Sequence, residues 1–204
     1  TLSFEETLKI LKKRGKSMQD AVPANEGSMI AVLGKELSAI EEILEKNNHD
    51  CYIANDNSNG QLVVSGNNQE IEKLILSLKN ENIKNIKLAV SAPFHCKLMK
   101  RATDVMINEI EKLKFNKPKN LLVSNVTAKE MQDTSMIKEL LIKQIESRVR
   151  WRESVLLMIN NGIEKFIEIG PGKVLSGLIK RINRDVKVSA INIEEDIRLI
   201  NIND

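Results

Sequence analysis

The sequence has little of what marks disulfide-stapled, metal-binding or membrane-spanning proteins. Only two of its 204 residues are cysteines, Cys51 and Cys96, and no C-x-x-C pair occurs. This argues against a disulfide framework and a zinc site, and it fits a reducing cytoplasm. No apolar run approaches the roughly 18 residues that a membrane-spanning helix needs. We therefore expect a cytoplasmic, globular protein with no metal and no membrane partner.

Aromatic side chains and an excess of one charge are also scarce. Aromatic residues make up 3% of the chain, and 31 basic against 28 acidic residues leave a net charge of +3. RNA-binding sheets stack bases on aromatic side chains, and nucleic-acid binding in general needs a concentrated basic surface. The sequence therefore predicts no nucleic-acid partner.

The hydrophobic pattern of the first half predicts an opening helix and a small α/β unit. Apolar positions after Ser3 follow a helical period up to Pro23. From about Gly27 to Val90 the pattern predicts the order β-α-β-β-α-β, with a hairpin at the turn-rich segment 56–60. A hairpin between two crossover helices is typical of a ferredoxin-like unit. The segments are SMIAVLG, LSAIEEILEK, CYIAN, QLVVSG, QEIEKLILSLK and IKLAV.

The second half predicts alternating strands and helices. A long amphipathic helix follows Pro93, and Pro118 stops its continuation. The alternation beyond it implies a parallel sheet. We predict an α/β fold in which a ferredoxin-like subdomain, residues 27–90, is inserted into a parallel-sheet body of residues 1–26 and 91–204. The later segments of that body are LLVSNV, a helix ending near Gln144, a helix from Trp151 to Asn160, KFIEIG, KVLSGLIKRI, VKVSAINI and a short helix in EEDIRLININD.

Two histidines and one arginine are the first candidates for chemistry. His95 stands in SAPFHCKLM, between a predicted strand and a helix, where it either acts as a general base or packs at the helix start. His49 lies in the polar turn KNNHD and is predicted to be a solvated loop residue. Arg14, among lysines of the opening helix, fits a solvated face or an anion site. At an anion site its planar donors would suit a carboxylate.

Three further patterns bear on function. Gly170, Pro171 and Gly172 lie between a predicted strand and a helix, where free amides could attract an anion or the glycines could make a tight connection. Their spacing lacks the full G-x-x-x-x-G-K-[ST] pattern of a nucleotide loop. Gln144 and Trp151 fit a helix end and a core position by default. No G-x-S-x-G elbow, which exposes the serine of α/β-hydrolase-like acyltransferases, occurs in the printed sequence.

Taken together, seven segments closely resemble the malonyl-CoA:acyl carrier protein transacylases of bacterial fatty acid synthesis. They occur in the family's order and cover nearly the whole chain: FEETLKILKKRGKSMQDAVP, GSMIAVLG, NSNGQLVVSG, SAPFHCKLMK, VSNVTA, RVRW and FIEIGPGKVLSGLIKRI. The resemblance implies an α/β-hydrolase-like body with an inserted ferredoxin-like subdomain. It also implies transfer of malonyl from malonyl-CoA to the phosphopantetheine thiol of acyl carrier protein, through an acyl-serine. The coenzyme A thioester is a substrate, and no further cofactor is implied.

The resemblance implies roles for particular residues. By its place in PFH, His95 matches the family's general base, and Gln144 matches the glutamine whose backbone carbonyl orients that base. Arg14 matches the arginine that grips the malonyl carboxylate. The remaining substrate-site positions are Met18, Asn55, Asn57 and Phe94, of which Phe94 is similar to members that accept malonyl rather than the bulkier methylmalonyl.

The sequence departs from the family pattern in several places. The nucleophile motif G-H-S-L-G and the oxyanion-hole segment G-Q-G-S-Q, which precede LSFEETL in the family, do not occur in it. Asn59 replaces a proline of the hairpin, and QIESRVRW departs from the family's proline-valine before the tryptophan. We therefore expect a chain that has the general base but forms no acyl-enzyme alone. The alternative is a non-catalytic remnant that binds acyl carrier protein.

Overall fold

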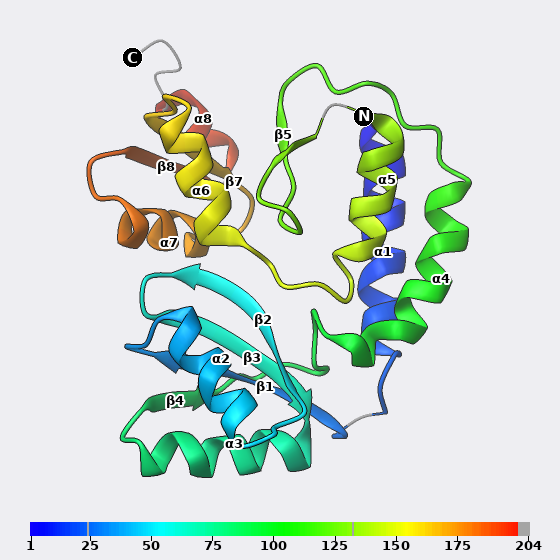
Figure 1. Cartoon of the computed structure of the whole chain (residues 1–204). Coiled ribbons are helices and arrows are strands. Elements are labelled where there is room, and N and C mark those ends of the chain that lie inside the picture. Colours follow the sequence, from blue (N-terminus) through cyan, green and yellow to red (C-terminus); the bar gives the residue numbers. More distant parts are fainter. Residues whose placement is uncertain (24, 132, 200–204) are drawn as a thin grey trace.

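A computed structural model describes residues 1–23, 25–131 and 133–199, and Figure 1 shows its elements in three neighbouring groups. One group is a sheet with two helices, one is a set of helices near the N-terminus, and one holds a short strand pair near the C-terminus. The elements in chain order are α1 Phe4–Gln19, β1 Gly27–Leu33, α2 Leu37–Lys46, β2 Cys51–Ser58, β3 Gln61–Asn67, α3 Asn68–Asn80, β4 Lys84–Lys87, the 3₁₀ turn η1 Lys97–Met99, α4 Lys100–Glu111, β5 Leu122–Val123, β6 Glu130–Met131, α5 Thr134–Lys143, α6 Trp151–Asn160, β7 Lys165–Ile169, α7 Val174–Ile182, β8 Lys187–Ile191 and α8 Glu194–Leu199.

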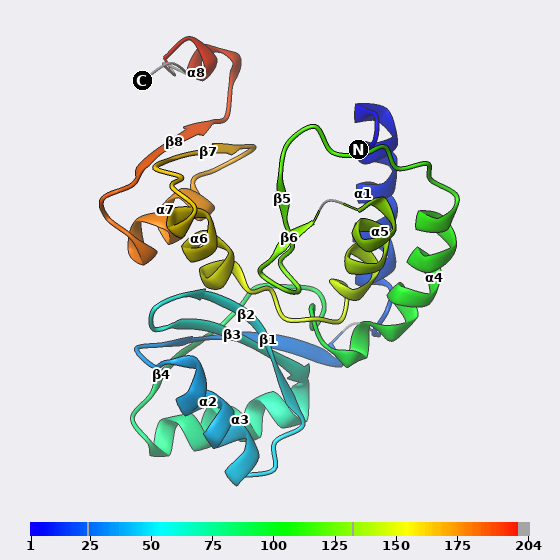
Figure 2. The same cartoon turned by 45° about the horizontal axis from the view of Figure 1, so that its top comes forward.

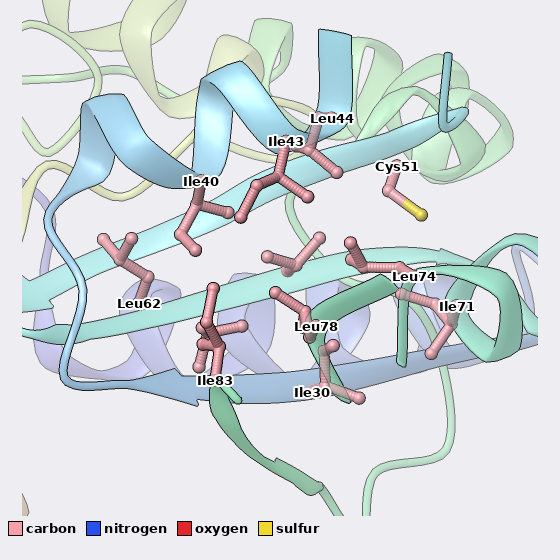
Figure 3. Close-up of a cluster of buried hydrophobic side chains, with 12 residues drawn as sticks. Ile30, Ile40, Ile43, Leu44, Cys51, Leu62, Ile71, Leu74, Leu78 and Ile83 are labelled. Carbon is pink, nitrogen blue, oxygen red and sulfur yellow. The ribbon is translucent and has the colours of Figure 1, made fainter. Parts of the chain in front are cut away.

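The first group is a four-stranded sheet in the order β2-β3-β1-β4, with every neighbouring pair antiparallel. Helices α2 and α3 cover one face of it (Figures 1 and 3). The predicted β-α-β-β-α-β order is therefore present. The last strand ends at Lys87 rather than at Val90, because its ladder with β1 ends where Lys87 pairs with Ile30.

The core of this group explains why its central strands are apolar without interruption. Ile30 and Leu62 point toward the helices and are almost fully buried there (Figure 3). Met29 and Val63, one residue away along the strands, point to the opposite face and pack against Phe94. Burial of each large aliphatic side chain contributes about 1.5–3 kcal/mol. Both faces of the sheet are thus used, and the second face carries the residue that precedes His95.

The other two groups differ from the predicted continuous parallel sheet. Helices α1 and α4 pack together over a buried cluster that includes Met18 and Met106. The segment LLVSNV does not join a parallel sheet: its residues Leu122 and Val123 pair antiparallel with β6. The left-handed backbone of Ala128, with φ 51°, and the hydrogen bond from its amide to the Ser124 carbonyl turn the chain back within a few residues. In the described residues, β7 and β8 are the only two strands that pair in parallel, and one isolated parallel bridge joins Asn55 to Val149.

His95 lies in the loop between β4 and the helix predicted to follow Pro93, in agreement with its predicted place between a strand and a helix. The His95 backbone is left-handed, with φ 59°, which neither a helix nor a strand accommodates. The Cys96 thiol donates to the Pro93 carbonyl at 3.0 Å and so ties the two sides of His95 together. The continuous helix α4 begins only at Lys100. His95 is therefore held in a tight loop that precedes the helix.

The remaining boundaries agree closely with the sequence prediction. Helix α1 ends at Gln19, four residues before Pro23, and α5 ends with Gln144 as its C-cap. The last predicted helix is present as α8, while residues 200–204 of that segment lie outside the described residues. No helix in the described ranges is both long enough and apolar enough to cross a membrane.

We predict that Gly27→Ala destabilises the protein through the loop that holds His95. A Cβ at position 27 would lie 2.3 Å from Cγ of Pro93, so Pro93 must move. Overpacking of this kind costs about 1–3 kcal/mol, which urea denaturation measures as a loss in the free energy of unfolding. Gly15→Ala in the exposed middle of α1 is the control, because nothing lies within 4 Å of its new Cβ. The control should raise that free energy by about 0.5–1 kcal/mol. Unchanged stability of Gly27→Ala would contradict the close packing.

Candidate active site

The central contact of the site joins His95 to the end of helix α5. Nδ1 of His95 lies 2.9 Å from the backbone oxygen of Gln144. A carbonyl only accepts hydrogen bonds, so Nδ1 carries the proton and Nε2 of the neutral ring keeps its lone pair. The last carbonyls of a helix lack partners within the helix, which makes Gln144 an available acceptor. In the described part of the chain, Nε2 has no hydrogen-bonding partner.

The surroundings of His95 keep the imidazole neutral. Burial lowers the pKa of His95, and the positive charge of Arg14 lowers it further, while the hydrogen bond to Gln144 acts in the opposite direction. The result is a pKa below the ordinary value of 6.5. At neutral pH the ring is therefore a neutral base whose Nε2 lone pair can accept a proton. This arrangement favours the general-base interpretation over simple packing at a helix start.

Arg14 provides a cation that no group in the described part of the chain neutralises. It lies on α1 one turn before the buried Met18, so the two residues share the inward side of that helix. Burial lowers the pKa of its guanidinium. Across residues 1–23, 25–131 and 133–199 the guanidinium makes no hydrogen bond and no ion pair. A partly buried cation without a partner is costly, and an anionic ligand would remove that cost. The anion-site alternative is therefore favoured over the solvated face.

Two of the apolar candidates lie beside these polar groups. Met18 is 4% exposed and packs in a cluster with Ala92 and Ile145, against which Phe94 also packs. Ala92 and Phe94 precede His95 in its loop, and Ile145 follows Gln144. The structure therefore brings together five of the seven predicted site residues: His95, Gln144, Arg14, Met18 and Phe94.

The two asparagine candidates stand apart from this group. Asn55 forms a bridge with Val149 just beyond α5, but no hydrogen bond in the described residues links Asn55 or Asn57 to His95 or Arg14. Asp56, between them, is buried, and its Oδ2 lies 3.2 Å from Nε of Arg152. Burial raises the pKa of Asp56, whereas the Arg152 charge opposes that rise. A role for the asparagines stays a prediction.

The interpretation of His49 as a solvated loop residue was wrong. Nε2 of His49 lies 2.9 Å from the Ser77 hydroxyl, and the residue is half-buried. His49 and His95 line the same cavity of about 570 Å³. The turn that holds His49 is polar in sequence. Its contact, Ser77 on α3, is 28 residues further along the chain. Local composition gives no sign of such a contact.

The glycine turn before α7 does not offer free amides at its helix start. The Glu168 carboxylate accepts from the amides of Leu175 and Ser176 at 3.1 and 2.7 Å. A bound carboxylate of the chain itself therefore occupies the place where an external anion would lie. The tight-connection alternative holds for Gly170 and Gly172, whose φ values are 141° and 91°.

Neither cysteine is an activated nucleophile. Cys51 and Cys96 are unpaired and buried, and burial raises the pKa of Cys51 to about 12 and that of Cys96 above its ordinary value. A thiol is reactive as its thiolate, which these shifts disfavour. No group of three or more His, Cys, Asp or Glu residues within the described ranges is arranged to hold a metal ion.

Comparison with known proteins places the chain in a class. The family model of the acyl transferase domain matches residues 1–194, so the chain is an acyltransferase domain. The malonyl CoA-acyl carrier protein transacylase of Staphylococcus aureus (strain MSSA476) is 43% identical over 207 residues, covering 100% of this chain and 67% of that protein. The chain belongs to the malonyl CoA-acyl carrier protein transacylase family.

Solved structures agree with this assignment. The transacylase of Clostridium perfringens Atcc 13124 superposes with a TM-score of 0.92 at 38% identity, over 97% of this chain and 63% of that one. A malonyl-transacylase solved in complex with its type II PKS acyl-carrier protein has a TM-score of 0.90 at 33% identity, over 97% of this chain and 65% of that one. The chain thus spans about two thirds of the length of these relatives.

We predict that Arg14→Gln raises the pKa of His95. The substitution removes a positive charge that disfavours protonation of the imidazole. A pH titration of the ring protons by NMR measures the shift, and His49→Asn assigns the two histidine signals. Lys13→Gln, which removes a charge from the neighbouring residue, is the control and should leave the His95 titration unchanged. The same midpoint in Arg14→Gln and in the parent would show that the two side chains are not coupled.

Proposed function

We propose that this chain supplies the general base and the carboxylate-binding arginine of a malonyltransferase that acts on malonyl-CoA and acyl carrier protein. The observation that supports this most directly is the His95–Gln144 hydrogen bond beside an unpaired Arg14. It combines a base of fixed tautomer with a cation suited to a substrate carboxylate. Membership in the transacylase family supplies the reaction.

In the first half of the reaction His95 activates a serine. Nε2 accepts the hydroxyl proton while the serine oxygen attacks the thioester carbon of malonyl-CoA. The carbon–sulfur bond then breaks, and His95 returns the proton to the coenzyme A sulfur. The Gln144 carbonyl stabilises the imidazolium that forms between these steps, which is the task of the acid in a full triad.

In the second half the same base activates the acceptor. Nε2 takes the proton of the phosphopantetheine thiol, and the sulfur attacks the malonyl-serine ester. The carbon–oxygen bond breaks, and the proton passes from His95 to the serine oxygen. One base of fixed orientation serves both halves, because each half begins with loss of a proton from the attacking atom.

Arg14 accounts for the choice of a carboxylated acyl group. Its fork of donors matches both oxygens of the malonyl carboxylate. A neutral acetyl group would leave the guanidinium unpaired, at a cost of about 1–3 kcal/mol. This corresponds to a preference for malonyl of about 5- to 150-fold.

The proposal assigns the serine nucleophile to the third of the relatives' length that this chain does not cover. It also treats residues 27–90 as a ferredoxin-like subdomain inserted into a body of residues 1–26 and 91–204, with β7 and β8 as part of a larger α/β-hydrolase-like sheet. Parallel strands are normally covered on both faces. Ile169 of β7 is 79% exposed and Val174 of α7 is 71% exposed, which fits a sheet that extends further.

Acyl carrier protein is the proposed macromolecular partner, and the cytoplasm is the proposed location. A similar malonyl-transacylase has been solved with its acyl-carrier protein. The two unpaired cysteines fit a reducing compartment. The second candidate function, a remnant that binds the carrier without transfer, shares this partner.

The test compares the chain alone with a fusion to the uncovered part of the Staphylococcus aureus relative. After incubation with malonyl-CoA, intact mass should show one malonyl group on the fusion and none on the chain. The fusion should then pass malonyl to holo-acyl carrier protein. His95→Gln in the fusion should slow this transfer by about 10²–10⁴-fold, while Lys13→Gln serves as its matched control.

Two outcomes would contradict the proposal. A malonyl adduct on the chain alone, mapped to a serine such as Ser17 or Ser91, would mean that the chain carries its own nucleophile. A fusion that unfolds cooperatively but accepts no malonyl would overturn the catalytic assignment. Carrier binding by such a fusion would then favour the remnant.

A further inference from the structure

The segment between α5 and α6, residues 144–150, carries the carbonyl that orients His95. The amide of Val149 donates to the Ala54 carbonyl at 2.8 Å, and the Asp56 amide donates to the Val149 carbonyl at 2.9 Å. Closer to α5, the Gln144 side chain donates to the Ser147 carbonyl at 2.9 Å. The segment is thus hydrogen-bonded to the edge strand β2 of the first sheet. The conformation of the segment sets the direction of the Gln144 carbonyl.

The side chain of Arg148 forms a second set of contacts between the same segment and its neighbours. Nη1 lies 3.0 Å from Oε1 of Glu41 on α2, and Nη2 lies 3.8 Å from Oε1 of Glu153 on α6. The Arg148 side chain is 19% exposed and the Glu41 side chain is 47% exposed, so the guanidinium is shielded from water while the carboxylate is partly screened by it. The guanidinium therefore joins a helix of the first sheet to the segment that follows Gln144.

This contact and His95 share one cavity. Glu41, Arg148 and His95 all line the cavity of about 570 Å³. The cavity is large enough for several waters, and a water that reached the His95 ring would compete with the Gln144 carbonyl for the Nδ1 proton. The charged or titratable side chains are Arg14 from α1 and, along this cavity, Glu41, Glu45, His49, Cys51, Tyr52, Glu146, Arg148 and Arg150.

We propose that Arg148 is a positioning residue for the general base, and that its ion pair with Glu41 clamps segment 144–150 so that the Gln144 carbonyl holds His95 in the Nδ1–H tautomer. This rests on the proposed role of His95. The ion pair is a side-chain restraint that adds to the backbone hydrogen bonds of Val149.

The tautomer of His95 tests the clamp directly. Nitrogen NMR of the ring, recorded above its pKa, should show a single Nδ1–H tautomer in the parent chain. Glu41→Gln and Arg148→Gln should each produce a mixture with the Nε2–H tautomer and faster solvent exchange of the Nδ1 proton. The two substitutions remove charges of opposite sign. A direct electrostatic effect would therefore move the tautomer ratio in opposite directions, whereas loss of the clamp moves it in the same direction.

Glu72→Gln is the matched control, because Glu72 forms a comparable pair with Lys87 at 2.8 Å within the first sheet group, outside the lining of the cavity. It should leave the His95 tautomer unchanged. Arg148→Lys keeps a cation within reach of Glu41 and should stay closer to the parent than Arg148→Gln. A single Nδ1–H tautomer in both clamp variants, with cooperative unfolding retained, would overturn the inference. The measurement needs no transfer, so its failure is distinguishable from failure of the malonyltransferase proposal.

Discussion

The hydrogen bond from His95 to the Gln144 carbonyl is the constraint on which the rest of the site depends. It fixes the tautomer of the imidazole and so decides which nitrogen accepts a proton. The bond needs a left-handed residue in a loop that Cys96 and Pro93 close, and a helix that ends with its carbonyl directed at that loop. Three parts of the chain are therefore arranged around a single contact, with the first sheet supporting both of its sides.

The electrostatics of the site follow from an arginine that lacks a counterion in the described residues. Arg14 has no counterion in the described residues and lowers the pKa of His95 from nearby. A bound carboxylate would offset that charge, and the imidazole would become more basic while the substrate is present. The same cation would thus serve selectivity and would link the strength of the base to occupancy of the site.

Much of the fold was predictable because it depends on short-range patterns. The order β-α-β-β-α-β, the end of α5 at Gln144 and the strand–helix–strand run from β7 to β8 all follow from periodicity and turn residues. Two predictions failed for a shared reason. The pairing of LLVSNV with β6 and the cover of His49 by α3 depend on neighbours that the local pattern does not contain.

By itself the sequence determined most of the elements and the family and proposed the site residues, because helical period, turn chemistry and ordered motifs are read within about ten to fifteen residues. Only the tertiary structure decided which of these residues meet. His95 and Gln144 are 49 residues apart, and Arg148 and Glu41 are 107 apart. Such contacts are formed by the packing of the whole chain. The local sequence around Arg14 is equally compatible with a solvated side chain and with a partly buried one. Only the packing of the rest of the chain decides between these two environments.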